Sequence, residues 1–88
     1  MANLTDLDSI GRLIDATKKY IADLEDCKKT IHDACEAFKF AMGNDDLSKK
    51  RLSELQTTFR ILNQIQQEAD AILQAQNQNR DQIIDIVT

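Results

Sequence analysis

Apolar residues recur every three or four positions from residue 10 to residue 42, and this spacing is the feature that most constrains the fold. An α-helix brings residues with this spacing onto one face, so the segment predicts a long amphipathic helix. The chain contains no proline that would interrupt such a helix. The stripe consists of Ile10, Leu13, Ile14, Thr17, Tyr20, Ile21, Leu24, Cys27, Ile31, Ala34, Cys35, Phe38, Ala41 and Met42.

A cluster of turn-forming residues, Gly43, Asn44, Asp45 and Asp46, follows this stripe. Gly43 suits the left-handed position just past a helix end, and any of the three polar residues can cap the next helix. Thr5 is the predicted cap of the first helix. A second stripe then comprises Leu52, Leu55, Phe59, Leu62, Ile65, Ala69, Ile72 and Leu73.

These elements predict an all-α fold, an antiparallel two-helix hairpin that forms one domain over residues 1–88. The expected helices cover about 5–42 and 47–87, and the expected turn covers 43–46. If the helices pair outward from the turn, residue i lies opposite roughly residue 90 minus i, so Phe59 faces Ile31 and Leu52 faces Phe38. Two such hairpins have the pattern needed to assemble into a four-helix bundle.

Beyond Leu73 the second stripe is interrupted, because Gln76 and Asn79 occupy positions where the pairing calls for apolar side chains. One interpretation is a solvated or fraying helix end. The other is a binding surface, in which apolar residues of the first helix lack counterparts and are covered by a helix of another chain. The predicted partner-binding residues are Leu7, Ile10, Leu13, Ile14, Phe40, Ile83, Ile84 and Val87.

Size and charge limit the classes of partner. A chain of 88 residues in two helices buries only a thin core, which favours a partner chain. The net charge of −4 and the pI of about 4.8 argue against nucleic acid. The sequence has neither the roughly 20 consecutive apolar residues of a membrane span nor the start of a cleaved signal. We therefore expect a cytoplasmic protein, exported, if at all, by a specialised route without a signal peptide.

The chain offers little for catalysis or for holding a cofactor. His32 is the only histidine, and Cys35 follows it by three residues on what should be an open helix surface, so we expect no enzyme activity, cofactor or metal. Asp45 and Asp46 are better explained as helix caps than as calcium ligands. Cys27 and Cys35 are roughly 12 Å apart along the helix and cannot bridge each other there. Packing is their main interpretation, with an intermolecular disulfide or metal binding as alternatives.

The chain resembles the WxG superfamily of helical hairpins handled by type VII secretion. Phe40-Ala41-Met42-Gly43 lies where that family has its Trp-x-Gly turn. The heptad-spaced apolar residues after it also follow the family's pattern: Leu55, Phe59, Leu62, Ile65, Ala69 and Ile72. The resemblance implies a small chaperone or targeting factor that binds the helical N-terminal region of a larger secreted effector.

Two other functions fit a short helical hairpin. One is a type III secretion needle subunit or needle chaperone, although the needle turn typically carries prolines and this chain has none. The other is a structural coiled-coil module that homodimerises into a four-helix bundle. All three are proteins that bind other helices.

Overall fold

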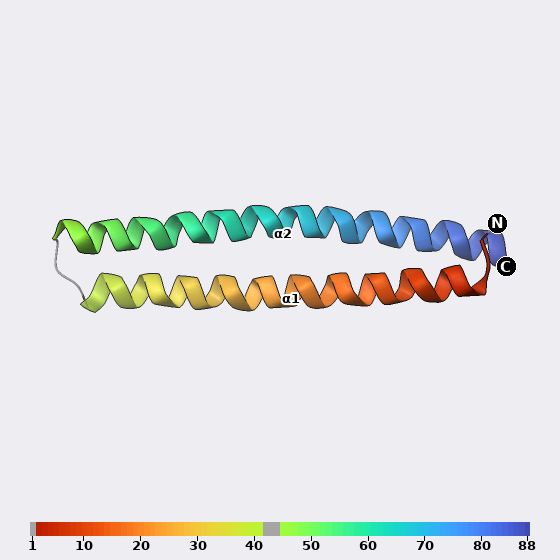
Figure 1. Cartoon of the computed structure of the whole chain (residues 1–88), viewed down its shortest axis with the longest axis horizontal. Coiled ribbons are helices and arrows are strands. Elements are labelled where there is room, and N and C mark those ends of the chain that lie inside the picture. Colours follow the sequence, from red (N-terminus) through yellow and green to blue (C-terminus); the bar gives the residue numbers. More distant parts are fainter. Residues whose placement is uncertain (1, 42–44) are drawn as a thin grey trace. The chain divides into compact units, whose positions relative to one another are not determined.

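The computed structural model describes residues 2–41 and 45–88, and it contains two long helices. Helix α1 spans Leu4–Ala41 and helix α2 spans Asp46–Val87 (Figure 1). The predicted all-α helical hairpin is therefore confirmed, with helix ends within one residue of the predicted ones. Gly43 and Asn44, the first two residues of the predicted turn, lie outside the described residues.

The hairpin divides into two compact units, which we describe separately. Unit 1 contains residues 2–22, at the red end of α1, and residues 67–88, at the blue end of α2 (Figure 1). Unit 2 contains residues 23–41 and 45–66. In each unit a segment of α1 runs antiparallel to a segment of α2. Neither described helix is long and apolar enough to cross a membrane.

Helix α1 begins at Leu4, two residues before the start that a cap at Thr5 would give. The side-chain oxygen of Asn3 accepts a hydrogen bond from the Asp6 amide at 3.1 Å, and the Asp6 carboxylate accepts one from the Asn3 amide at 3.0 Å. These reciprocal bonds satisfy two backbone donors that the helix itself leaves free. The predicted cap at Thr5 is thus wrong, because Asn3 makes the capping bonds and Thr5 lies within the helix.

Helix α2 is capped by Asp45, one of the three predicted candidates. Its carboxylate accepts a hydrogen bond from the Ser48 amide at 2.7 Å, which lowers the pKa of Asp45. Asp46, which the sequence placed in the turn, is instead the first residue of the helix. There its negative charge lies at the positive end of the helix dipole.

Both helices bury or half-bury residues at a strict alternation of three and four positions, and we call these residues the seam. The seam of unit 1 comprises Leu7, Ile10, Ile14, Thr17 and Ile21 on α1, and Ala69, Leu73, Gln76, Arg80, Ile83 and Val87 on α2. The seam of unit 2 comprises Leu24, Lys28, Ile31, Cys35 and Phe38 on α1, and Ser48, Leu52, Leu55, Phe59, Leu62 and Gln66 on α2.

Contacts within unit 2 test the predicted pairing of residue i with roughly residue 90 minus i. Lys28 donates hydrogen bonds to Asn63 and Gln66, and the His32 ring packs beside the Phe59 ring. Each of these pairs agrees with the predicted register to within about one helical turn. The register inferred from the sequence is therefore confirmed in unit 2.

Candidate protein-binding surfaces

The structure divides the predicted partner-binding residues into three groups. Ile10 and Ile14 are buried, with only 6% and 1% of their surface exposed. The second group is half-buried and comprises Leu7, Ile83 and Val87. The third group is exposed and comprises Leu13, Phe40 and Ile84. The prediction that Ile10 and Ile14 form an exposed surface is therefore wrong.

Ile10 and Ile14 are buried although the seam of unit 1 contains polar residues on α2. The register places Gln76 opposite Ile14 and Arg80 opposite Ile10, and both polar residues are half-buried. Long polar side chains can cover apolar neighbours with their methylene groups. The carbonyl oxygen of the Gln76 side chain is itself buried and accepts no hydrogen bond within the part of the chain that the structure describes. The seam of unit 1 is thus closed, but at the cost of one unsatisfied acceptor.

A different set of apolar residues is exposed in unit 1. On α1, Leu13 and Tyr20 are 55% and 49% exposed and lie seven residues apart. On α2, Ile72 and Ile86 are 54% and 61% exposed, with Asn79 midway between them. Each of these residues immediately precedes a seam residue, so each lies on the same flank of its own helix.

The two flanks belong to one side of unit 1. Leu13 of α1 and Asn79 of α2 line one open groove of about 580 Å³, whose other lining residues include the seam residues Ile10 and Ile83. Tyr20 and Ile72 continue these flanks by one heptad each. We call the surface formed by Leu13, Tyr20, Ile72 and Ile86 the apolar face of unit 1. At this heptad position Asp6 precedes Leu13 on α1 and also lines the groove, and Asn79 separates Ile72 from Ile86 on α2.

The opposite flank of unit 1 is more polar. A groove of about 410 Å³ on this side is lined by Leu4, Leu7, Asp8, Gly11, Arg12 and Asp15. Arg12 and Asp8 form an ion pair of 3.1 Å at its rim. Leu4 and Ile84 are exposed at the corresponding heptad position near the chain ends, but Lys18, Asp70 and Asn77 occupy that position farther in. Exposed apolar surface is therefore more continuous on the apolar face.

A polar network covers one flank of unit 2. The Lys28 ammonium donates to Asn63 at 2.9 Å and to Gln66 at 2.7 Å, and it lies 5.6 Å from the centre of the Phe59 ring. The Gln66 amide in turn donates to Glu25. A lysine at a seam position is tolerated because its ammonium group is hydrogen-bonded and lies over an aromatic ring.

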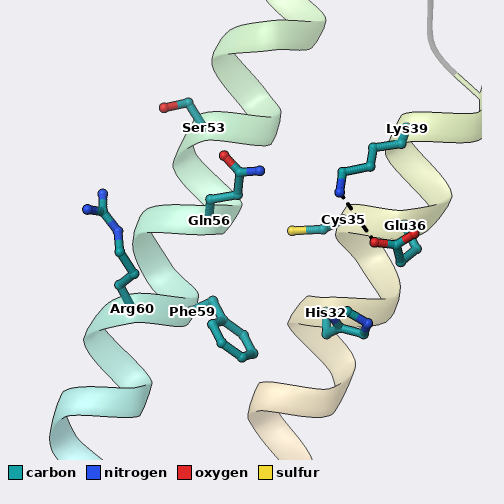
Figure 2. A pocket seen from close by; sticks show the side chains of 8 residues that line it. All are labelled: His32, Cys35, Glu36, Lys39, Ser53, Gln56, Phe59 and Arg60. Atoms are coloured by element: carbon teal, nitrogen blue, oxygen red, sulfur yellow. Dashed lines mark hydrogen bonds and ion pairs between the residues drawn. The ribbon is translucent and has the colours of Figure 1, made fainter.

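Next to this network lies a groove of about 420 Å³, shown in Figure 2. The side chains that line it are His32, Cys35, Glu36, Lys39, Ser53, Gln56, Phe59 and Arg60. In Figure 2 the Cys35 thiol points across toward α2 and the Phe59 ring points toward α1, while Arg60 is directed away from α1. Glu36 and Lys39 pair with each other at 3.3 Å on the same helix. The groove thus has an apolar floor and a rim of mixed charge.

The two cysteines have different surroundings. Both are free thiols, and Cys35 is buried in the seam of unit 2 while Cys27 is exposed. The predicted packing role is confirmed for Cys35, but it is wrong for Cys27. The reason is helical phase, because Cys27 precedes the seam residue Lys28 by one position and so lies on the flank. Among the described residues, no group of three or more His, Cys, Asp or Glu side chains could hold a metal ion.

The width of the two apolar stripes in the sequence is a signal for the apolar face. Leu13, Tyr20 and Ile72 belong to the same broad stripes as their seam neighbours, the buried Ile14 and the half-buried Ile21 and Leu73. A stripe two residues wide at every heptad is broader than a single partner helix covers. The excess width of the stripes therefore indicates a second apolar surface.

Comparison with known proteins finds no family model, no curated protein and no solved structure that matches this chain.

Proposed function

We propose that the protein is a non-enzymatic adaptor that binds helices of another protein through the apolar face of unit 1. The observation that supports this function is the difference between the two sides of that unit. Leu13, Tyr20, Ile72 and Ile86 each expose about half of their surface on one side, where Asp6 and Asn79 are the polar residues, whereas the other side carries the ion pair of Asp8 and Arg12 together with Lys18, Asp70 and Asn77. A largely apolar strip with polar borders is a common docking surface for an amphipathic helix.

The resemblance to the WxG superfamily supports a specific partner class, the helical N-terminal region of a larger type VII effector. In this proposal the protein acts as a chaperone or targeting factor in the cytoplasm, and it leaves the cell only if the secretion system carries it with its cargo. Covering the apolar face with effector helices would extend the two-helix unit into a larger bundle.

The test is coexpression and copurification with the products of the neighbouring genes, among which this proposal requires a larger protein with a helical N-terminal region. We expect tagged wild-type protein to retain that partner after coexpression, and Ile72→Glu to lose it, because a carboxylate would be buried without a counter-charge. Gln74→Glu is the matched control, since it adds the same charge to an exposed residue of the same helix. Equal retention by wild type and Ile72→Glu would exclude this face as the binding surface.

Phe40 is a second candidate contact in unit 2, because 91% of its surface is exposed near the end of α1. Exposed aromatic residues are frequent sources of binding energy at interfaces. We expect Phe40→Ala to weaken partner binding without changing the helix content measured by circular dichroism. Thr58→Ala, at another exposed position of unit 2, should leave the affinity unchanged. If both variants bind like the wild type, Phe40 has no part in the interface.

A further inference from the structure

A carboxylate lies at one end of the apolar face of unit 1. Asp6 lines the groove of this face together with Leu13, and like Leu13 it immediately precedes a seam residue. One oxygen of the Asp6 carboxylate accepts a hydrogen bond from the Asn3 amide. A carboxylate has further acceptor sites, so Asp6 can also accept a hydrogen bond from a partner.

A second carboxylate borders the face at its other end. Glu68 is exposed and precedes Ile72 by four residues, so the two side chains are neighbours on the surface of α2. Glu68 immediately precedes the seam residue Ala69. Ser9 has the same relation to Ile10, and Ser9 lines the groove of the face. Glu68 therefore belongs to the same side of unit 1 as that groove.

The basic residues of unit 1 lie away from this face. Arg12 lines the groove on the opposite flank, where it is held in an ion pair. Lys19 follows Arg12 by one heptad, and Lys18 follows Gly11, another residue of that opposite groove, by one heptad. The other basic residue in the described part of unit 1 is Arg80, which is a half-buried seam residue. The charged groups of the apolar face are therefore acidic.

We propose that the helix bound by the apolar face is basic, with Lys or Arg side chains along both edges of its apolar stripe. This inference rests on the proposed binding face and adds the charge of the helix that this face accepts. Lysine and arginine can cover apolar surface with their methylene groups while their charged ends reach carboxylates at the rim. An acidic helix would bring like charges together at both ends of the face. A second copy of this chain would present the same two carboxylates.

The positions of the two carboxylates also define the length of the bound helix. Leu13 and Asn79 line the same groove, so Asp6, one heptad before Leu13, lies level with about residue 86 of α2. Glu68 lies about 27 Å along the axis from that level. A bound helix of about five turns therefore extends from one carboxylate to the other. Because Asp6 belongs to α1 and Glu68 to α2, the two ends of the bound helix need basic residues on opposite edges.

Two synthetic peptides test the charge of the bound helix. Both are amphipathic helices of about 20 residues with leucine at heptad positions, and they differ only in carrying Lys or Glu beside the leucine stripe. We expect the dissociation constant of the Lys peptide to be about tenfold lower than that of the Glu peptide. In the double variant Asp6→Asn with Glu68→Gln this ratio should fall about fivefold, because the amides keep the size of the side chains but not their charge. Fluorescence anisotropy of the labelled peptides measures each constant.

The matched control removes the same number of charges from the other side of unit 1. Asp70→Asn with Asp81→Asn changes two exposed residues that each follow a seam residue, whereas Asp6 and Glu68 each precede one. This control should keep the full preference for the Lys peptide. An equal loss of preference in both double variants would mean that only the net charge of the protein attracts the peptide, and it would overturn the inference. Equal binding of the two peptides by the wild type, or binding of neither, would also overturn it.

The variant Ile72→Ser separates this inference from the proposed function. It makes the face more polar without changing its charge, so it should weaken the binding of the Lys peptide while circular dichroism shows unchanged helix content. If both peptides bind equally well and both lose affinity in Ile72→Ser, the face accepts helices of either charge, so the inference fails and the proposed function stands. If Ile72→Ser binds the Lys peptide like the wild type, the peptide is bound elsewhere and the inference fails. The proposed function fails separately, by equal copurification of a partner with wild type and Ile72→Glu.

Discussion

Polar residues enter the seam in both units, but with different consequences. In unit 2 the ammonium group of Lys28 has two hydrogen-bond acceptors across the seam and an aromatic ring beneath it. In unit 1 the carbonyl oxygen of Gln76 is buried without a donor. The comparison shows that a polar seam residue stabilises pairing only where the partner helix supplies matching groups. Unit 2 therefore has a register fixed by polar contacts, whereas unit 1 depends on apolar burial.

The largest effect should come from the apolar core of unit 1. Ile14→Ala should lower the free energy of unfolding by about 3 kcal/mol, because Ile14 is almost completely buried and its removal leaves a cavity. Leu13→Ala is the matched control and should cost less than about 1 kcal/mol, since Leu13 is more than half exposed. Urea denaturation at one fixed protein concentration measures both. Equal losses would mean that unit 1 does not depend on its buried residues.

The next largest effect should be an increase in the free energy of unfolding. Gln76→Leu should raise the free energy of unfolding by about 1.5 kcal/mol, because leucine removes the unsatisfied acceptor and retains the apolar volume. Gln78→Leu, at an exposed position of the same helix, provides the control and should have little effect. A loss of stability in Gln76→Leu would indicate that the Gln76 side chain makes a favourable polar interaction after all.

The corresponding change in unit 2 should be destabilising. Lys28→Met keeps an unbranched side chain but removes the donor to Asn63 and Gln66, so we expect a loss of about 1 kcal/mol. Lys29→Met, one residue away and exposed, should cost less. If Lys28→Met and Gln76→Leu changed stability in the same direction, the contrast between the two units would not hold.

The smallest effect concerns the cap of α2 in unit 2. The Ser48 amide lowers the pKa of Asp45 below its usual value of 3.8, so the capping bond is at full strength above that value and is lost as the pH falls through the lowered pKa. Hydrogen exchange of the Ser48 amide should therefore lose protection only in strong acid. In Asp45→Asn, where the cap has no charge to lose, this loss should be absent. Acid sensitivity in both proteins would point to another group.

Much of this fold followed from spacing alone. The apolar periodicity located both helices, and counting outward from the turn gave the register that Lys28 and Phe59 confirm. The cap at Asn3 was missed because Thr5 is also a good capping residue, and the choice depends on where the first backbone turn forms. The burial of Ile10 and Ile14 was missed because Gln76 and Asn79 were expected to leave the seam open, whereas in the structure Asn79 is exposed and the seam residues Gln76 and Arg80 are half-buried. Which side of unit 1 exposes apolar residues depends on which of two adjacent residues lies in the seam. A stripe that includes both residues does not distinguish them.

The unequal exposure of the two thiols makes the opening of unit 2 measurable in the unmodified protein. Cys27 and Cys35 lie on the same helix, and one is exposed while the other is buried in the seam. A thiol reagent should modify Cys27 directly, but it should reach Cys35 only when the two helices of unit 2 separate. The ratio of the two labelling rates therefore reports how often that separation occurs. Mass spectrometry of peptides from a time course would follow this breathing motion without a fluorophore, an isotope label or a mutation.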